Sequence, residues 1–147
     1  MDRFSPKLKQ QVIAPKKIYV ADHGICNFLS FKLSKNLGHI MENIVCIEIL
    51  RKKVVNHYLD VYYWKDHQQN EVDFVVKDRG KIRELIQVCY DISEDRTKDR
   101  EIKSLLKASK ELRCSQLVVI TWDYESETKI EGKTVSFTPL WKWLLSV

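Results

Sequence analysis

Residues 62–91 read YYWKDHQQNEVDFVVKDRGKIRELIQVCYD, and this stretch decides the fold. Aromatic residues at 62–64, an alternating segment at 72–77 and an apolar run at 85–90 are typical of three consecutive strands. Polar turns at 66–70 and 78–80 separate the three segments. The sequence therefore predicts a three-stranded meander at the centre of the chain.

The middle strand of this meander carries an acidic residue, Asp73, inside an apolar segment. Successive side chains of a strand point to opposite faces, so a strand that buries its apolar residues on one face presents Asp73 and Glu71 on the other. The next strand offers Gln87 and Cys89 on a common face, because they are two residues apart. We expect function where these side chains meet. The residues assigned to the buried face are Val72, Phe74 and Val76.

Helices and one buried strand are predicted on either side of the meander. A largely apolar helix begins at Gly38, ends near Val54 and carries Glu42 close to its start. After the meander we expect an amphipathic helix at 97–113, a strand covered on both faces at 116–122, an edge hairpin at 128–137 and a final helix from Pro139.

The N-terminal segment has a different composition. Residues 1–16 contain two prolines and several lysines without a sustained period, which favours a linker or an N-terminal tail. Residues 17–21 predict a short strand, and Asp22 is placed to cap a helix that ends near Leu33. We expect a single domain over residues 17–147, a length able to bury its own core.

Charge is unevenly distributed along the chain. The net charge is +5, and residues 1–57 hold ten Lys and Arg against four acids, a net of +6, so the remainder is about neutral. A basic first third can follow a phosphate backbone, or it can be a solvated surface that meets an acidic neighbouring domain.

Motifs for several protein classes are missing. The four cysteines are widely spaced without a CxxC pair, which argues against structural zinc and for free thiols in a reducing compartment. There is no apolar run long enough to cross a bilayer and no secretory leader, so we expect a cytoplasmic protein without a membrane partner. No GxxxxGK[ST], GxGxxG or GxSxG pattern occurs, so we expect this chain to bind no nucleotide through a P-loop.

The ordered segments GHIMENIVCIEILR, NEVDFVV, LIQVCYDIS, TKDREIKSLLKASKEL, LVVITWDYE and PLWKWLL resemble a C-terminal domain of unknown function that ends many archaeal and bacterial AAA-type ATPases. This domain is similar in turn to the PD-(D/E)XK, or restriction-endonuclease-like, nuclease superfamily. The resemblance implies an α/β fold with an α-β-β-β-α-β three-layer core and a mixed central sheet, to which a C-terminal hairpin and a terminal helix are added. It also implies upstream ATPase and winged-helix modules as partners.

The resemblance further implies a site. The acid of the superfamily's first helix matches Glu42, its strand aspartate matches Asp73, its third acidic or amide position matches Gln87, and its lysine position is held by Cys89. Carboxylate and amide oxygens suit Mg²⁺, so Glu42, Asp73 and Gln87 are the implied metal ligands. Because Gln87 is uncharged, we expect Mg²⁺ to bind weakly.

A thiol at position 89 cannot replace the ammonium that positions the attacking water and stabilises negative charge. By analogy with the loss of one oxyanion donor, this change lowers the rate by roughly 10²–10³. Lys77, four residues beyond Asp73, is the candidate for a migrated cation, and Lys65 and Arg83 are further cations near the strands.

Three functions remain open from the sequence. The first is a nuclease-fold module that binds DNA or regulates an ATPase, with weakened or lost phosphodiester cleavage. The second is an active Mg²⁺-dependent endonuclease with a migrated lysine. The third is a protein-interaction domain that does not bind nucleic acid. The oligomeric state stays open.

Overall fold

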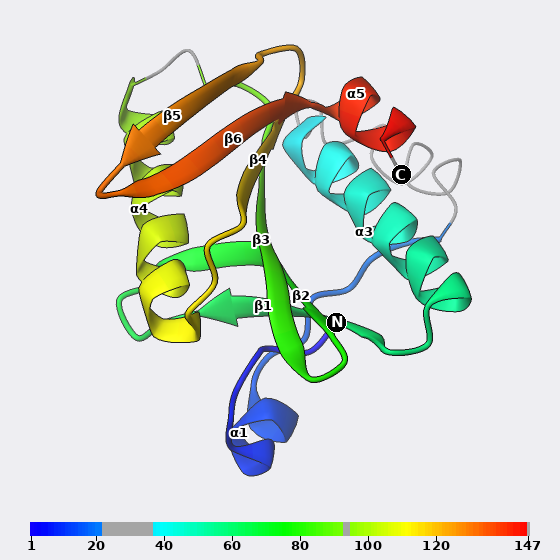
Figure 1. Ribbon diagram of the computed structural model, residues 1–147. Helices are drawn as coiled ribbons and strands as arrows, with labels where there is room; N and C mark the ends of the chain where they lie inside the picture. Colours follow the sequence, from blue (N-terminus) through cyan, green and yellow to red (C-terminus); the bar gives the residue numbers. More distant parts are fainter. Residues whose placement is uncertain (22–36, 93–94, 147) are drawn as a thin grey trace, which may run out of the picture.

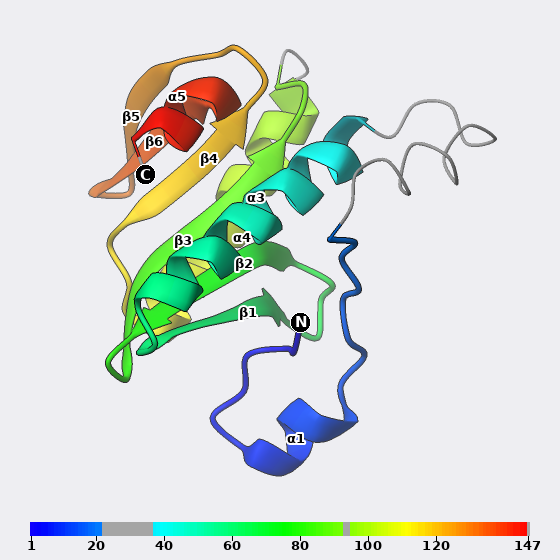
Figure 2. The same cartoon turned by 90° about the vertical axis from the view of Figure 1, so that its right-hand side faces the viewer.

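The structure is a computed structural model, and it describes residues 1–21, 37–92 and 95–146 (Figure 1). A mixed six-stranded sheet in the order β1-β2-β3-β4-β6-β5 forms its centre. Helix α3 (Leu37–Val55) lies on one face of the sheet and helix α4 (Asp95–Leu112) on the other (Figures 1 and 2). The remaining elements are α1 (Leu8–Ile13), β1 (Leu59–Lys65), β2 (Glu71–Asp78), β3 (Lys81–Cys89), β4 (Leu117–Thr121), β5 (Ser126–Ile130), β6 (Lys133–Pro139) and α5 (Leu140–Leu145).

The predicted meander is confirmed. Strands β1, β2 and β3 pair antiparallel, and α4 then returns the chain so that β4 pairs parallel to β3. The predicted hairpin is also confirmed, with β6 parallel to β4 and β5 at the edge of the sheet. The turns Arg79–Gly80 and Glu131–Gly132 have positive φ at both residues, the conformation that two-residue hairpins need and that glycine adopts without strain. The mixed α/β class expected from the sequence is therefore correct.

The sheet separates two apolar clusters. The cluster on the α4 side contains Trp64, Leu85, Leu105 and Phe137, whereas the cluster on the α3 side contains Met41, Phe74, Ile86 and Trp143. Helix α5 belongs to the α3 side, because Leu140 and Trp143 pack into that cluster. Burial of apolar surface on both faces holds the layers together.

The alternation predicted for β2 is wrong, because the strand contains a β-bulge. Tyr62 pairs with Val75 and Trp64 pairs with Val72, so two residues of β2 stand opposite Tyr63 alone. The two faces exchange at this point: Val72 and Val75 pack on the α4 side, whereas Phe74 and Val76 pack on the α3 side. The bulge comprises Asp73 and Phe74, and β-bulges commonly re-aim a side chain in this way.

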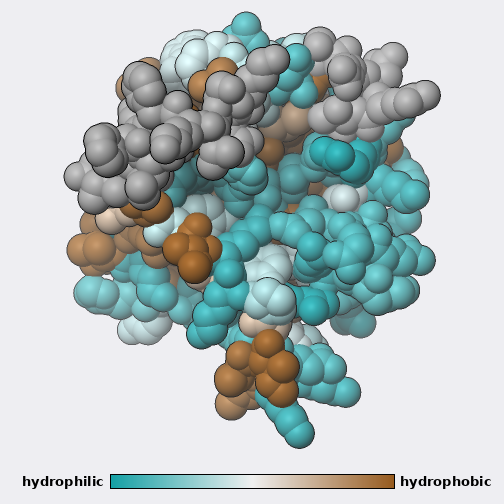
Figure 3. All heavy atoms as spheres, turned by 180° about the vertical axis from the view of Figure 1, so that it is seen from behind, coloured by the Kyte–Doolittle hydropathy of each residue, from teal (hydrophilic) through white to brown (hydrophobic). Residues whose placement is uncertain are grey.

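The N-terminal segment packs along the outer strand of the sheet. Arg3 forms a parallel bridge with Tyr63 of β1, and the backbone of Phe4 donates a 2.6 Å hydrogen bond to the Tyr63 carbonyl. Within the segment expected to be irregular, residues 8–13 form the short helix α1, whose Leu8, Val12 and Ile13 side chains are exposed. Figure 3 shows the apolar patch over this helix at the bottom of the view. The segment therefore covers the backbone groups of an edge strand.

Two predictions for this region have different outcomes. The strand predicted at 17–21 is wrong, since residues 17–20 form no strand pairing. The helix predicted from Asp22 to Leu33 lies outside the described residues. The helix predicted at 38–54 is confirmed as α3. In the described part of the chain, no helix has the length and apolar character needed to cross a membrane.

Candidate functional site

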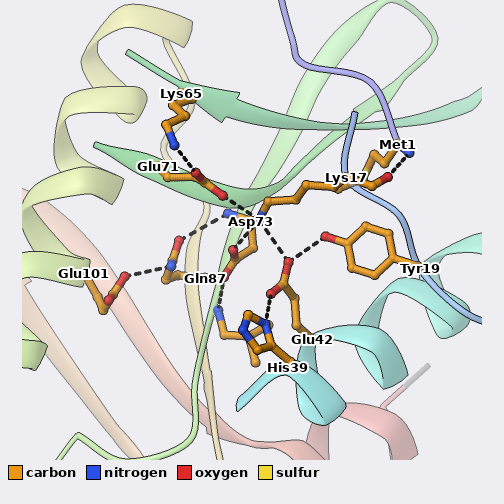
Figure 4. A network of polar contacts seen from close by, with 11 residues as sticks. Met1, Lys17, Tyr19, His39, Glu42, Lys65, Glu71, Asp73, Gln87 and Glu101 are labelled. Carbon is orange, nitrogen blue, oxygen red and sulfur yellow. Dashed lines mark hydrogen bonds and ion pairs between the residues drawn. The ribbon is translucent and has the colours of Figure 1, made fainter. Parts of the chain in front are cut away.

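A lysine from the N-terminal segment lies among three carboxylates from the helix and the meander (Figure 4). The Nζ atom of Lys17 is 2.9 Å from Oε1 of Glu42, 2.7 Å from Oε1 of Glu71 and 2.9 Å from Oδ1 of Asp73. Lys65 also pairs with Glu71, at 3.0 Å. We call Lys17, Glu42, Glu71 and Asp73 the acid cluster.

The acid cluster is assembled by elements far apart in the sequence. Glu42 lies in the second turn of α3, and the bulge in β2 turns Asp73 toward that helix. The approach of Lys17 depends on Asn43, whose side-chain amide donates to the Val20 carbonyl and accepts from the Val20 N–H, both at 2.8 Å. This two-bond contact holds the extended segment 17–20 against α3.

Alternation along the extended segment selects which side chains enter the cluster. Lys17 and Tyr19 face inward, whereas Ile18 between them is 90% exposed. The Tyr19 hydroxyl donates a 2.6 Å hydrogen bond to Oε1 of Glu42, and the Tyr19 ring packs against Phe74 with centroids 5.9 Å apart. The segment thus contributes both a cation and a phenol to Glu42.

Burial and charge both shift the proton affinities of the cluster. Burial lowers the pKa of Lys17, but the nearby charges of Asp73 and Glu42 outweigh it and raise this pKa above its ordinary value. Burial and the Glu42 charge raise the pKa of Asp73 to about 6, against the opposing effect of Lys17. Burial would raise the pKa of Glu71, yet its contacts with Lys17 and Lys65 lower it. The cluster is a compact ion network with the ammonium at its centre.

Gln87 lies beside Asp73 but is oriented toward the opposite helix. Its Oε1 accepts a 3.2 Å hydrogen bond from the backbone N–H of Asp73, and its Nε2 donates a 2.7 Å hydrogen bond to Oε2 of Glu101 on α4. The second carboxylate oxygen of Asp73 accepts from the Val88 N–H at 2.9 Å. Of the residues predicted to form the site, Glu42 and Asp73 therefore meet at Lys17. Gln87 instead binds the backbone N–H of Asp73 and the side chain of Glu101.

Cys89 and Lys77 lie away from the acid cluster. Cys89 is buried in the cluster on the α4 side and its thiol donates to the Asp91 carbonyl, at an S–O distance of 3.2 Å. Burial raises the pKa of this thiol to about 11, so it is neutral at pH 7. Among the residues that the structure describes, Lys77 is not an ion-pair partner of Glu42, Glu71 or Asp73. The bulge explains this, because it interrupts the alternation that would have aligned position 77 with Asp73.

The fit of a metal ion to this arrangement is poor. Mg²⁺ needs carboxylate oxygens that converge on a free point, and here the Lys17 ammonium fills the point between Glu42 and Asp73. The side-chain oxygen of Gln87 already accepts the Asp73 N–H. Over residues 1–21, 37–92 and 95–146, no three His, Cys, Asp or Glu residues are arranged to hold a metal. A metal ion would therefore have to displace Lys17.

Two participants in the network were missed from the sequence. Lys17 begins the short strand predicted at 17–21 and was not singled out there. The signal that could have found it is its spacing to Tyr19, which puts both residues on one side of an extended chain. Glu101 is 12% exposed and stands four residues before Leu105, so it is an acid within the apolar stripe of α4. An acid at such a position signals a buried polar partner.

Comparison with known proteins identifies relatives of unknown activity. An uncharacterized protein of Methanocaldococcus jannaschii, MJ1544, is 39% identical over 152 residues, which cover 99% of this chain and 32% of that protein. An uncharacterized protein of Haemophilus influenzae is 27% identical over 125 residues, covering 85% of this chain and 28% of that protein. No solved structure matches. The chain thus spans about a third of the length of these relatives.

Most of the chain also matches a known protein family. Residues 37–143, from α3 to α5, match the family described as "Domain of unknown function (DUF4143)". This range includes Glu42, Glu71 and Asp73 but excludes Lys17 and Tyr19. The match covers well over half of the chain and agrees with the expected resemblance to a prokaryotic domain of unknown function. The chain therefore belongs to the DUF4143 family.

Proposed function

We propose that this chain is a PD-(D/E)XK-type nuclease-fold domain that binds DNA or regulates an associated AAA-type ATPase, with phosphodiester cleavage weakened or lost. The order of α3, the antiparallel β1-β2-β3 meander, α4 and the parallel strand β4 supports the fold assignment. The positions of Glu42 on the helix and Asp73 on the second strand support it further, since these two side chains share a partner.

The observation that carries the proposal is the Lys17 ammonium at the centre of the acid cluster. It lies 2.7–2.9 Å from three carboxylates and neutralises the negative charge that would attract Mg²⁺. At the other two positions of the superfamily pattern, Gln87 is uncharged and Cys89 is a buried neutral thiol. A site with its anionic ligands already paired and its usual cation absent is poorly suited to metal-dependent hydrolysis.

The same observation also supports a second candidate, an active endonuclease whose lysine has migrated to Lys17. In that case a divalent ion would take the position between Glu42 and Asp73, and the displaced ammonium would remain nearby to stabilise charge on a scissile phosphate. The acids and the cation needed for this chemistry are all present in the acid cluster.

Association with an ATPase is supported by the lengths of the relatives. The two uncharacterized proteins extend well beyond the region that this chain matches, which is expected when the matched region is one module of a larger protein. The Lys17 contact is one way in which such a module could be held inactive.

The experiment that tests the proposal combines DNA binding with cleavage. The chain is incubated with supercoiled plasmid in Mg²⁺ or Mn²⁺ and compared with the Asp73→Asn variant, and duplex binding is measured over a series of salt concentrations. The proposal predicts salt-dependent binding without nicking. Metal-dependent nicking that Asp73→Asn abolishes would establish the active endonuclease instead. Absence of binding at low salt would refute a nucleic-acid role and leave protein interaction.

A further inference from the structure

A pocket of about 200 Å³ lies at the carboxyl ends of the parallel strands β3 and β4. Open α/β sheets commonly bind ligands at this edge. The lining residues come from the ends of the two strands, from the residues that directly follow them and from the first turn of α4: Tyr90, Asp91, Ile92, Lys98, Thr121, Asp123 and Tyr124. The volume is below the ~300–1,000 Å³ of sites for drug-sized ligands, so it suits one ring system.

Tyr90, which lines this pocket, forms a platform with a second aromatic side chain, Trp122. Cys89 and Thr121 are the last paired residues of β3 and β4, and the next residue of each strand is aromatic, Tyr90 and Trp122. Their rings lie side by side with centroids 5.6 Å apart and an interplanar angle of 48°. Tyr90 is 36% exposed and Trp122 is 51% exposed. We call this pair the aromatic platform.

The aromatic platform lies close to the acid cluster. The N–H of Val88, two residues before Tyr90, donates to the carboxylate of Asp73. Two residues of an extended strand span about 7 Å. Side chains two residues apart on a strand also share a face. Val88 precedes Tyr90 by two residues and Ile120 precedes Trp122 by two, and both pack in the cluster on the α3 side. Glu42 is part of α3. Tyr90 therefore follows, by about 7 Å of strand, the residue whose N–H binds Asp73.

The charges around the pocket indicate which rings it would take. Lys98 lies with its Nζ 5.4 Å from the Tyr124 ring centroid and supplies a cation beside the aromatic surfaces. Asp91 and Asp123 also line the pocket, and their carboxylates can accept hydrogen bonds. A carboxylate accepts from the exocyclic amino group of a base, whereas an ammonium pairs with phosphate. An amino-bearing base with a phosphate attached has both complementary groups.

We propose that the aromatic platform and the adjoining pocket bind unpaired bases of single-stranded nucleic acid, with a preference for bases that carry an amino group. Stacking on exposed aromatic rings is the usual way in which proteins hold single strands, because every base has a flat face. Bases inside a duplex are already stacked on one another and do not reach the platform. This inference rests on the proposed nucleic-acid function and adds the form of the strand and its position relative to the acid cluster.

The test measures fluorescence anisotropy of labelled oligonucleotides with the whole chain at low salt. Oligo-dC is expected to bind more tightly than oligo-dT, which lacks an exocyclic amino group. Trp122→Ala is expected to weaken oligo-dC binding roughly ten- to a hundred-fold, and Trp122→Phe is expected to retain most of the affinity. The matched control is Trp141→Ala, which removes another exposed tryptophan, 59% accessible on α5, and is expected to leave binding unchanged. Thermal melts establish that each variant is folded.

The outcomes separate this inference from the proposed function. If Trp122→Ala and Trp141→Ala bind oligo-dC equally well, the platform is not the binding site, although a nucleic-acid role survives. If the chain binds duplex but no single strand, the inference also fails and the proposed function stands. If neither form binds and an arginine-rich peptide is held through Trp122 instead, both are overturned, because the pocket then recognises a cation.

Discussion

Replacing Lys17 by Met keeps the length and apolar character of the stem and removes only the ammonium. Three carboxylate oxygens lie 2.7–2.9 Å from that ammonium, whose side chain is 22% exposed. At an effective dielectric constant of about 20, each contact at this distance represents roughly 6 kcal/mol of attraction, most of which is offset by desolvation. Removal of one partner from a largely buried ion pair typically costs about 3–5 kcal/mol, because the other partner stays buried without a counter-ion. We expect a destabilisation of this size at pH 8.

The loss of folding stability caused by Lys17→Met should depend on pH in a defined direction. In the native chain the pKa of Lys17 is raised, so its contribution to stability is complete at neutral pH and is lost only as pH rises above its ordinary pKa. In the variant, the carboxylates repel one another and their pKa values rise, so the folded state is favoured at low pH and loses stability as pH increases. The difference between the two proteins should therefore be largest at pH 8 and smallest near pH 4.

The assay is urea unfolding followed by tryptophan fluorescence at a series of pH values. Lys16→Met is the matched control, because Lys16 precedes Lys17 and makes one surface contact with Asp2 at 3.1 Å, with 61% of its side chain exposed. A surface pair of this kind contributes about 0–1 kcal/mol. Equal midpoints for Lys16→Met and Lys17→Met at pH 8 would refute the central place of Lys17 in the acid cluster.

Three further predictions concern the surroundings of the cluster. Gln87→Glu should destabilise the fold, because the new carboxylate would face Glu101. Adding Glu101→Gln should restore the urea midpoint. A double-mutant cycle that shows no coupling between the two changes would contradict their contact. The pKa of Asp73 in the folded chain is raised to about 6, so its contribution to stability is present below the pKa of the unfolded chain and is lost as pH rises through 6. Asp73→Asn should therefore remove that part of the pH dependence. An unchanged slope of unfolding free energy against pH between pH 4 and 7 would count against this prediction. Asn43→Ala should release segment 17–20 and speed amide exchange at Val20, and unaltered protection there would show that Asn43 does not hold the segment.

The meander was predictable because its signals are local. Aromatic and apolar residues typical of strands mark the three segments, and the Arg79–Gly80 turn needs positive φ at both residues, which its glycine favours. The bulge at Asp73 was not predictable in the same way, since two residues opposite one is a property of the pairing with β1 and not of either strand's composition. This single extra residue explains why the side chains that share a face with Asp73 were predicted wrongly. It also explains why Lys77 was chosen as the migrated cation.

The candidate site was predictable in part. Glu42 and Asp73 were selected through a family resemblance, and the fold brings them within reach of one ammonium. The partners of Lys17 could not be found from periodicity, because they lie 25 and 56 positions away in the sequence. Gln87 was expected to offer its oxygen to a metal, whereas its local hydrogen bonds to the Asp73 backbone and to Glu101 depend on the packing of α4.

The most direct measurement of the central claim is a calorimetric titration of Mn²⁺ into the native chain, Lys17→Met and Lys17→Met/Asp73→Asn at pH 7.5. If the Lys17 ammonium occupies the position of a metal ion, the native chain binds no Mn²⁺ at millimolar concentration, Lys17→Met binds one ion, and the double variant loses it. Stoichiometric binding by the native chain that Asp73→Asn alone removes would contradict the account, because the carboxylates would then hold a metal with Lys17 still in place.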